Sequence, residues 1–126
     1  MFSVYARENS DVEPIRVLPG AEGLALGMAA VFAGGALAKA GATAKPTHIV
    51  MGPAVAGPGE ELLYPAIRVL PTTVFSAPAS GAVAQAGGVV TLAGDGLGVT
   101  NTAEGGVFTV LHTQNKAGTP VLGYFA

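Results

Sequence analysis

Two histidines and one pair of adjacent carboxylates are the side chains best suited to chemistry in this chain. His48 and His112 each lie within a strand-like run, and neither has a Cys, His or carboxylate neighbour at metal-ligand spacing. Glu60 and Glu61 could divide acid and base roles if burial separated their pKa values, but the Gly and Pro residues at 57–59 indicate a solvated loop. The sequence therefore predicts no metal site, and only the convergence of both histidines with a carboxylate would revive an enzymatic reading.

Glycines and serines give no stronger signal of catalysis. Residues 94–98 superficially match a nucleotide-binding loop, but the third glycine spacing is missing, no basic residue follows, and the downstream residues are typical of strands. Ser3, Ser10, Ser76 and Ser80 all lie outside a Gly-x-Ser-x-Gly turn. We therefore expect a protein that is not an enzyme and uses no cofactor.

The composition points to contacts with other molecules. A chain of 126 residues fits one domain, and with no cysteine or tryptophan its core must rely on Val, Leu, Ile and a few Phe. Only 11% of the residues are charged, whereas a soluble domain usually has about a quarter. Subunit or partner contacts would cover part of so neutral a surface. The six basic residues are scattered singly and the net charge is −2, which argues against a nucleic-acid partner.

One apolar run is nearly long enough to span a membrane. It covers residues 23–41 and contains five glycines, with Gly34 and Gly35 in the middle, where a hairpin would turn. We therefore expect no membrane partner. The residues after Met1 do not form a secretory signal, because the charged residues Arg7 and Glu8 stand where such a signal has its apolar core.

The elements that would position any site are short strands. Nineteen glycines and nine prolines place turn signals every few residues, which is typical of an all-β protein. We predict a small β-barrel or sandwich of short antiparallel strands over residues 15–126, preceded by an extended N-terminal arm at 1–14. Phe2 and Tyr5 would anchor this arm on a neighbour; a frayed terminus is the alternative.

Runs of strand-forming residues between turn signals locate the strands. They are expected at residues 15–18, 28–32, 36–40, 47–51, 62–70, 72–76, 89–92, 97–100, 107–112 and 121–125. Two hairpins would turn at Gly34-Gly35 and Asp95-Gly96, with an alanine-rich helix as the alternative for the first. Pro65 should lie at an edge or a bulge. Residues 77–88 should form a surface excursion that includes a turn of helix near 82–86.

The pentapeptide IRVLP occurs twice, at residues 15–19 and 67–71. The flanking residues of the two copies differ, which disfavours a duplication and favours a short strand ended by proline. In the second copy Arg68 would point outward if Ile67 and Val69 face the core. The first copy leaves the arm, so Arg16 is the better interface candidate.

The order of features along the chain is similar to that of a known family. A polar N-terminal segment precedes the run from Gly23 to Ala54, which contains AVFAGGALAKAG and is followed by GPGEE and LLYPAIRVLPTTVFSAPAS. The chain closes with GDGLGVTNTAEGGVFTVLHTQNKAGTPVLGYFA. This arrangement resembles the small all-β head decoration, or cementing, proteins of tailed bacteriophages, and the resemblance covers most of the chain.

The resemblance implies a structural role in a virion. Such a protein binds the outside of the major capsid protein lattice at local three-fold axes, as a homo-trimer, and stabilises the shell. It would be made in the host cytoplasm and reside on the capsid surface. Phe2, Tyr5 and Arg7 of the arm, together with Arg16, are the expected contacts.

Two other functions stay open. One is a different minor structural subunit of the virion, such as a fibre-base or tail component. The other is a ligand-binding or carbohydrate-binding β-domain that uses the loops at residues 53–61 and 77–88.

Overall fold

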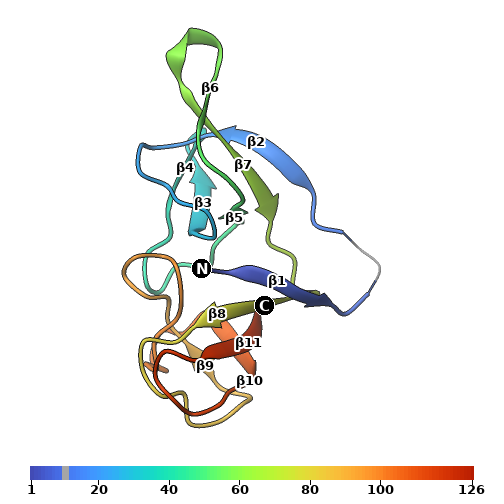
Figure 1. The fold of residues 1–126 in the computed structure, drawn as a ribbon, viewed down its shortest axis with the longest axis vertical. Helices are drawn as coiled ribbons and strands as arrows, with labels where there is room; N and C mark the ends of the chain where they lie inside the picture. Colours follow the sequence, from blue (N-terminus) through green and yellow to red (C-terminus); the bar gives the residue numbers. More distant parts are fainter. Residues whose placement is uncertain (10–11) are drawn as a thin grey trace.

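The structure is a computed structural model that describes residues 1–9 and 12–126, and it consists of two antiparallel β-sheets packed together (Figure 1). Sheet A has the strand order β1-β8-β11-β10-β9. Its strands are β1 (Ser3–Arg7), β8 (Thr73–Pro78), β9 (Val89–Val90), β10 (Phe108–His112) and β11 (Pro120–Phe125).

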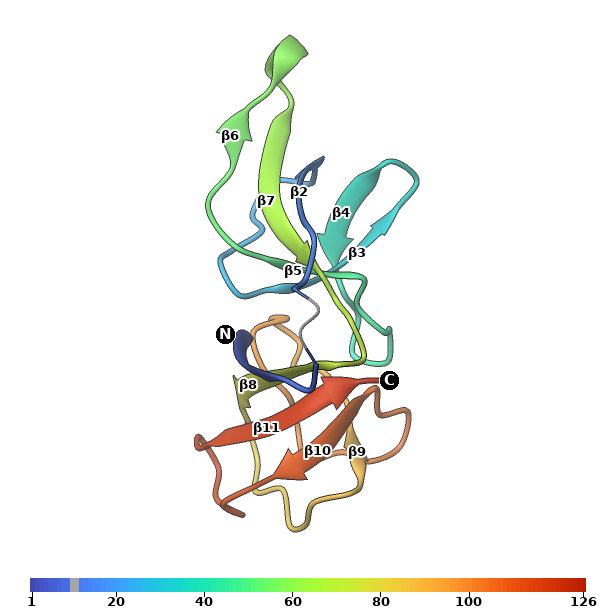
Figure 2. The same cartoon turned by 90° about the vertical axis from the view of Figure 1, so that its right-hand side faces the viewer.

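Sheet B has the order β2-β7-β5-β3-β4, and a short sixth strand, β6, also pairs with β7. Its strands are β2 (Ile15–Pro19), β3 (Ala29–Ala33), β4 (Ala36–Lys39), β5 (His48–Val50), β6 (Val55–Ala56) and β7 (Leu62–Arg68). A single 3-10 turn at Pro58–Glu60 joins β6 to β7, and the hairpin around it projects away from sheet A (Figure 2). Since no α-helix forms in the described ranges, the predicted all-β class is confirmed.

Of the two predicted architectures, residues 1–9 and 12–126 form the sandwich and no closed barrel. Sheet B curls, however, until Gly20, just after β2, forms a parallel bridge with Leu37 of β4. The Ala21 N–H donates to the Leu37 carbonyl at the same point, with an N to O distance of 3.0 Å. The two edges of sheet B therefore meet at one end and stay apart at the other.

The hairpin predicted around Gly34 and Gly35 is confirmed. Ala33 pairs with Ala36 across a two-residue turn, in which Gly34 and Gly35 have φ of 62° and 84°. Positive φ at both central residues is the requirement of the hairpin turn whose twist matches that of the strands, and glycine meets it without strain.

Pro65 lies inside β7 and not at an edge strand, since β7 pairs with β2 on one side and with β5 and β6 on the other. Its carbonyl accepts a hydrogen bond from the Met51 N–H, with an N to O distance of 2.8 Å. The N–H and C=O of one strand residue point to the same neighbour. The N–H that Pro65 lacks would therefore point to the gap between β5 and β6, so the proline removes no bond to β2.

The stretch after β8 differs from the predictions in two ways. Residues 82–86 form no turn of helix, and Val83 is buried instead of lying on a surface excursion. Residues 97–100 form no strand; they pair with the preceding segment at an isolated antiparallel bridge between Leu92 and Val99 and through hydrogen bonds beside it. The Asp95 side chain still closes the predicted turn by accepting a hydrogen bond from the Leu97 N–H, at 2.9 Å.

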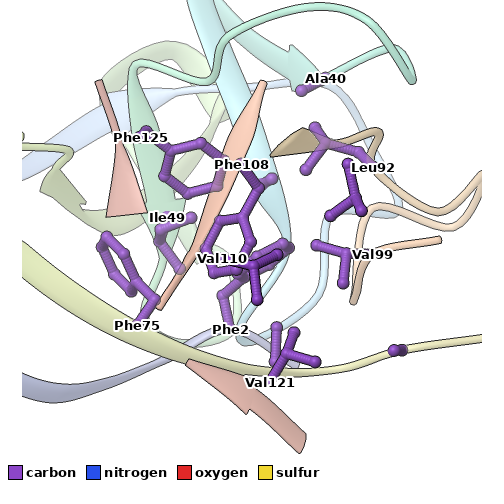
Figure 3. Packing of buried hydrophobic residues seen from close by; sticks show 14 of the residues in the cluster. Phe2, Ala40, Ile49, Phe75, Leu92, Val99, Phe108, Val110, Val121 and Phe125 are labelled. Atoms are coloured by element: carbon purple, nitrogen blue, oxygen red, sulfur yellow. The ribbon is translucent and has the colours of Figure 1, made fainter. Parts of the chain in front are cut away.

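The main core lies between the two sheets and is dominated by four phenylalanines (Figure 3). The ring of Phe2 lies 5.6 Å from that of Phe125 and 5.9 Å from that of Phe108, measured between centroids. Phe75 completes the group at 6.5 Å from Phe2, and the Phe2 and Phe75 rings meet edge to face. These separations fall within the favourable range for aromatic pairs. Ile49 and Ile67 of sheet B pack against the same cluster.

The arm predicted at 1–14, ahead of a β-domain at 15–126, contains a strand of sheet A. Ser3–Arg7 is extended, but it forms β1 and pairs with β8 of the same chain. Phe2 is only 1% exposed. The first residues are thus part of the core and of sheet A, because a large ring gains more by burial among other rings than by exposure.

Candidate functional site

The two IRVLP copies lie on neighbouring strands of sheet B. The first copy is β2 and the second begins in β7, and in their antiparallel register Ile15 faces Ile67 while Arg16 faces Ala66. Arg16 and Arg68 are therefore diagonal neighbours on one face of the sheet, since side chains two residues apart in a strand point the same way. Antiparallel pairing of the two copies brings their arginines together.

Both arginines line a groove of about 550 Å³ inside the curl of sheet B, near the end where its edges stay apart. Three of the six basic residues of the chain line it, namely Arg16, Lys45 and Arg68. The remaining lining comes from Pro14, Leu18, Phe32, Pro46, Thr47, His48 and Val69. None of the acidic residues in the described ranges is among the lining residues. The groove is a concentrated positive region on a protein whose net charge is negative.

His48 lines this groove, and its ring is held by a hydrogen bond and an aromatic contact. Its Nδ1 lies 2.8 Å from the Thr47 hydroxyl oxygen, which also accepts a hydrogen bond from the Phe32 N–H at 2.8 Å. Phe32 packs edge-on to the imidazole at 6.1 Å between ring centroids. Burial, and then the nearby charge of Arg68, lower the pKa of His48 below its usual 6.5. A lowered pKa favours the neutral ring, in which Nδ1 accepts the Thr47 proton when the ring hydrogen is on Nε2.

The opposite face of β2 and β7 is apolar: Ile67 of β7 is buried there in the main core, whereas the residues of β2 on this face are open to solvent. Ile15 and Val17 are 67% and 56% exposed, although both are apolar side chains of the kind that usually lies in a core. Val17 faces Pro65 in the register, and Leu63 of β7 faces both Pro19 and Val55 of β6. We call this surface the β2–β6–β7 apolar face; it consists of Ile15, Val17, Met51, Val55, Leu63 and Pro65.

The edge of β2 accompanies this face. β2 is the first strand in the order of sheet B. The Arg68 N–H donates to the Pro14 carbonyl and the Gly20 N–H to the Leu62 carbonyl, so the even-numbered residues of this stretch bond to β7. The backbone groups of Ile15 and Val17 then point away from the sheet. An edge of this kind is a template for another strand.

The four predicted contact residues do not come together. Phe2, predicted to anchor the arm on a neighbour, is a core residue whose ring contacts Phe75, Phe108 and Phe125 of its own chain. Tyr5 is 65% exposed on β1 of sheet A. Arg16 is exposed on β2 of sheet B and lines the groove.

Arg7 is engaged within its own chain. Its Nε donates to both oxygens of Glu13, at 2.8 Å and 3.0 Å, and Glu13 Oε1 also accepts from the Thr73 hydroxyl at 3.1 Å. Burial alone would raise the pKa of Glu13, but its backbone hydrogen bond, Arg7 and Thr73 together lower it below 4.5. Glu13 therefore stays charged at neutral pH and joins the ends of β1 and β8 to the chain that enters β2.

The residues considered for catalysis or metal binding are spread over both sheets. His48 and His112 belong to β5 of sheet B and β10 of sheet A. Glu60 and Glu61 are exposed, in agreement with the predicted solvated loop. Over residues 1–9 and 12–126, no three His, Cys, Asp or Glu side chains cluster in a way that could hold a metal ion. Within the same residues no helix is long and apolar enough to cross a membrane.

The groove was not predicted from the sequence. Its basic residues are scattered singly along the chain, and only the pairing of β2 with β7 brings Arg16 near Arg68. The signal present was the repeat itself, which places an arginine at the same position of two strands.

Comparison with known proteins assigns no family. No protein-family model matches the sequence, and no curated protein matches it either.

Proposed function

We propose that this chain is a non-enzymatic structural protein that binds the outside of a bacteriophage capsid lattice, with the major capsid protein as its partner, and stabilises the shell. The observation that carries the proposal is the β2–β6–β7 apolar face, which leaves Ile15 and Val17 more than half exposed beside a strand edge that no other strand of the described residues covers. The order of sequence features that resembles decoration proteins supports the same function.

Binding through this face follows from elementary energetics. Removing apolar surface from water contributes roughly 25 cal/mol per Å². Ile15 and Val17 of β2 offer such surface on one side of β7, and Val55 of β6 and Met51, which follows β5, offer it on the other. The outward backbone groups of β2 can add a strand from the partner, which supplies directional hydrogen bonds. With 11% charged residues in the whole chain, little desolvation of charge opposes the contact.

Trimerisation on the shell belongs to the same proposal. A trimer at a local three-fold axis places three copies of the apolar face in equivalent positions, and each additional contact raises the effective concentration of the next. The carbohydrate-binding alternative has less support, because the loops at residues 53–61 and 77–88 contain no aromatic side chain that could stack on a sugar ring.

The test is co-sedimentation of the purified protein with phage shells that lack it. Ile15→Ser combined with Val17→Ser should reduce the bound fraction at least tenfold, and Val89→Ser combined with Leu111→Ser, which changes exposed apolar residues of sheet A, should leave it unchanged. Circular dichroism of each variant checks the fold. Equal binding by both double variants would remove the apolar face from the proposal, and failure of the native protein to bind any shell would overturn the function.

A further inference from the structure

The groove of sheet B has the form of a ligand site that the proposed function does not use. It lies inside the curl of the sheet, which is closed at the Gly20–Leu37 bridge and open near Arg16, Thr47 and His48. The mouths of curled and barrel-like sheets are among the places where small ligands bind, because the backbone there holds a concave wall open.

The groove gathers three positive charges. Arg16 and Arg68 are diagonal neighbours on the same face of β2 and β7, a relation that places their Cα atoms about 7–8 Å apart. Lys45 adds a third cation at the rim. Three like charges in one concavity repel each other, and an oxyanion between them relieves that repulsion while accepting charge-assisted hydrogen bonds, bidentate ones from each guanidinium.

The other walls of the groove are apolar. Leu18 and Phe32 are only partly exposed, and Pro14 and Pro46 extend the apolar lining beside the cations. The imidazole of His48 and the Thr47 hydroxyl supply polar atoms to the lining. A groove of about 550 Å³ is within the range of sites for drug-sized ligands. An inorganic ion would leave the apolar wall unused.

We infer that this groove binds a small organic oxyanion, a carboxylate or a phosphate attached to an apolar or aromatic body. The anionic group lies between Arg16 and Arg68 with Lys45 nearby, and the apolar body packs against Leu18 and Phe32. This site is on the opposite face of β2 from Ile15 and Val17, because side chains alternate along a strand. It can therefore be occupied while the apolar face is bound to a shell.

The experiment is a titration of the ¹⁵N-labelled full chain followed by ¹H–¹⁵N chemical shifts. The probes are phenyl phosphate, benzoate, inorganic phosphate and benzyl alcohol. Saturable shifts at residues 16, 45–48 and 68 with phenyl phosphate or benzoate support the proposal, and the tighter of the two identifies the preferred oxyanion. Inorganic phosphate, without a ring, and benzyl alcohol, without a charge, should bind at least tenfold more weakly.

Charge variants distinguish binding in the groove from nonspecific attraction of the anion to any positive charge of the protein. Arg16→Gln and Arg68→Gln should each weaken binding of the better probe by about tenfold, the effect of one charge-assisted hydrogen bond. Lys116→Gln changes the net charge equally from a loop outside the groove and should leave the affinity unchanged.

Three results would overturn the inference: absence of saturable shifts with both organic anions, equal weakening by Lys116→Gln, or equal affinity for inorganic phosphate and phenyl phosphate. None of them affects the shell-binding test, which relies on Ile15 and Val17.

Discussion

The interior of this protein has two parts that are built from different residues. Between the sheets, Phe2, Phe75, Phe108 and Phe125 fill the space with rings whose centroids lie 5.1–6.5 Å apart. Inside the curl of sheet B, the buried residues are Met28, Ala30, Leu37, Val50, Tyr64 and Ala66, with one aromatic ring among them. The first part is closed by aromatic packing; the second contains smaller side chains and opens into the basic groove.

The difference shows how a chain with few aromatic residues divides its roles. Four of its five phenylalanines hold the two sheets together, where large buried areas contribute most to stability. The fifth, Phe32, lines the groove. Small residues inside sheet B leave room for a ligand but contribute less burial, so stability should be more sensitive to changes between the sheets than within the curl.

Phe2→Ala should produce the largest loss of stability. Removing a ring that is 1% exposed and contacts three other rings should lower the free energy of unfolding by about 3–5 kcal/mol. Tyr5→Ala, three residues along the same segment but 65% exposed, should change it by less than about 0.5 kcal/mol. Urea unfolding followed by circular dichroism measures both. A loss for Phe2→Ala as small as that for Tyr5→Ala would mean that the N-terminal segment does not contribute to the core.

The placement of Phe2 also shows where sequence patterns stop being informative. The hairpin at Gly34-Gly35 and the class of the fold could be predicted, because turn residues and period-two alternation act over a few neighbours. A terminal phenylalanine in a polar segment carries no local sign of its partners. Its burial depends on Phe75, Phe108 and Phe125, which only the assembled sheets bring to one place.

Glu13→Ala should have the second largest effect. The carboxylate is the acceptor for Arg7 and for the fully buried Thr73, and leaving the threonine hydroxyl without it should cost about 2 kcal/mol. Most of this cost should come from Thr73, because the Arg7 side chain is 39% exposed and water screens its pairing. Thermal unfolding at pH 7 measures the loss, with Glu104→Ala, an exposed acidic residue, as the control.

The same carboxylate predicts a dependence on acid. Its folded pKa lies below 4.5, so its contribution is fully present above that pH and is lost as the pH falls through the folded pKa. Stability measured from pH 6 to pH 3 should therefore fall more steeply in the native protein than in Glu13→Ala. Parallel pH profiles would show that Glu13 is not stabilised by folding.

Tyr64→Phe addresses the second part of the interior. The Tyr64 hydroxyl donates to the Ala21 carbonyl at 2.8 Å and so fixes the segment that follows β2 over the smaller cluster. Loss of this bond should lower the free energy of unfolding by about 1 kcal/mol, less than Phe2→Ala because the ring itself remains buried. Amide hydrogen exchange at residues 20–27 should increase in the variant. Unchanged exchange there would indicate that the bridge at Gly20, and not Tyr64, holds the curl.

The groove inside that curl could not be predicted for a related reason. Spacing along the chain separates Arg16 from Arg68 and from Lys45, so each is an isolated charge in the sequence. Their proximity follows from the register of β2 on β7, in which Ile15 faces Ile67, and register is set by which face of each strand becomes buried. The repeat was visible, but its meaning depended on a pairing that local patterns do not specify.

The smallest expected effect is a pH dependence centred on His48. Its folded pKa is lowered below 6.5 by burial and by Arg68, and Arg16 and Lys45 also line the groove; in the described part of the chain no acidic residue does. The folded state therefore binds a proton less readily than the unfolded state, so this contribution is present above pH 6.5 and is lost as the pH falls through the folded pKa. His48→Asn should reduce the loss of stability between pH 7.5 and pH 5.5, whereas His112→Asn, at an exposed position of β10, should not.

Because an oxyanion in the groove would offset the added charge, phenyl phosphate should diminish the acid effect in the native protein. An identical profile for both histidine variants would place the pH dependence outside the groove.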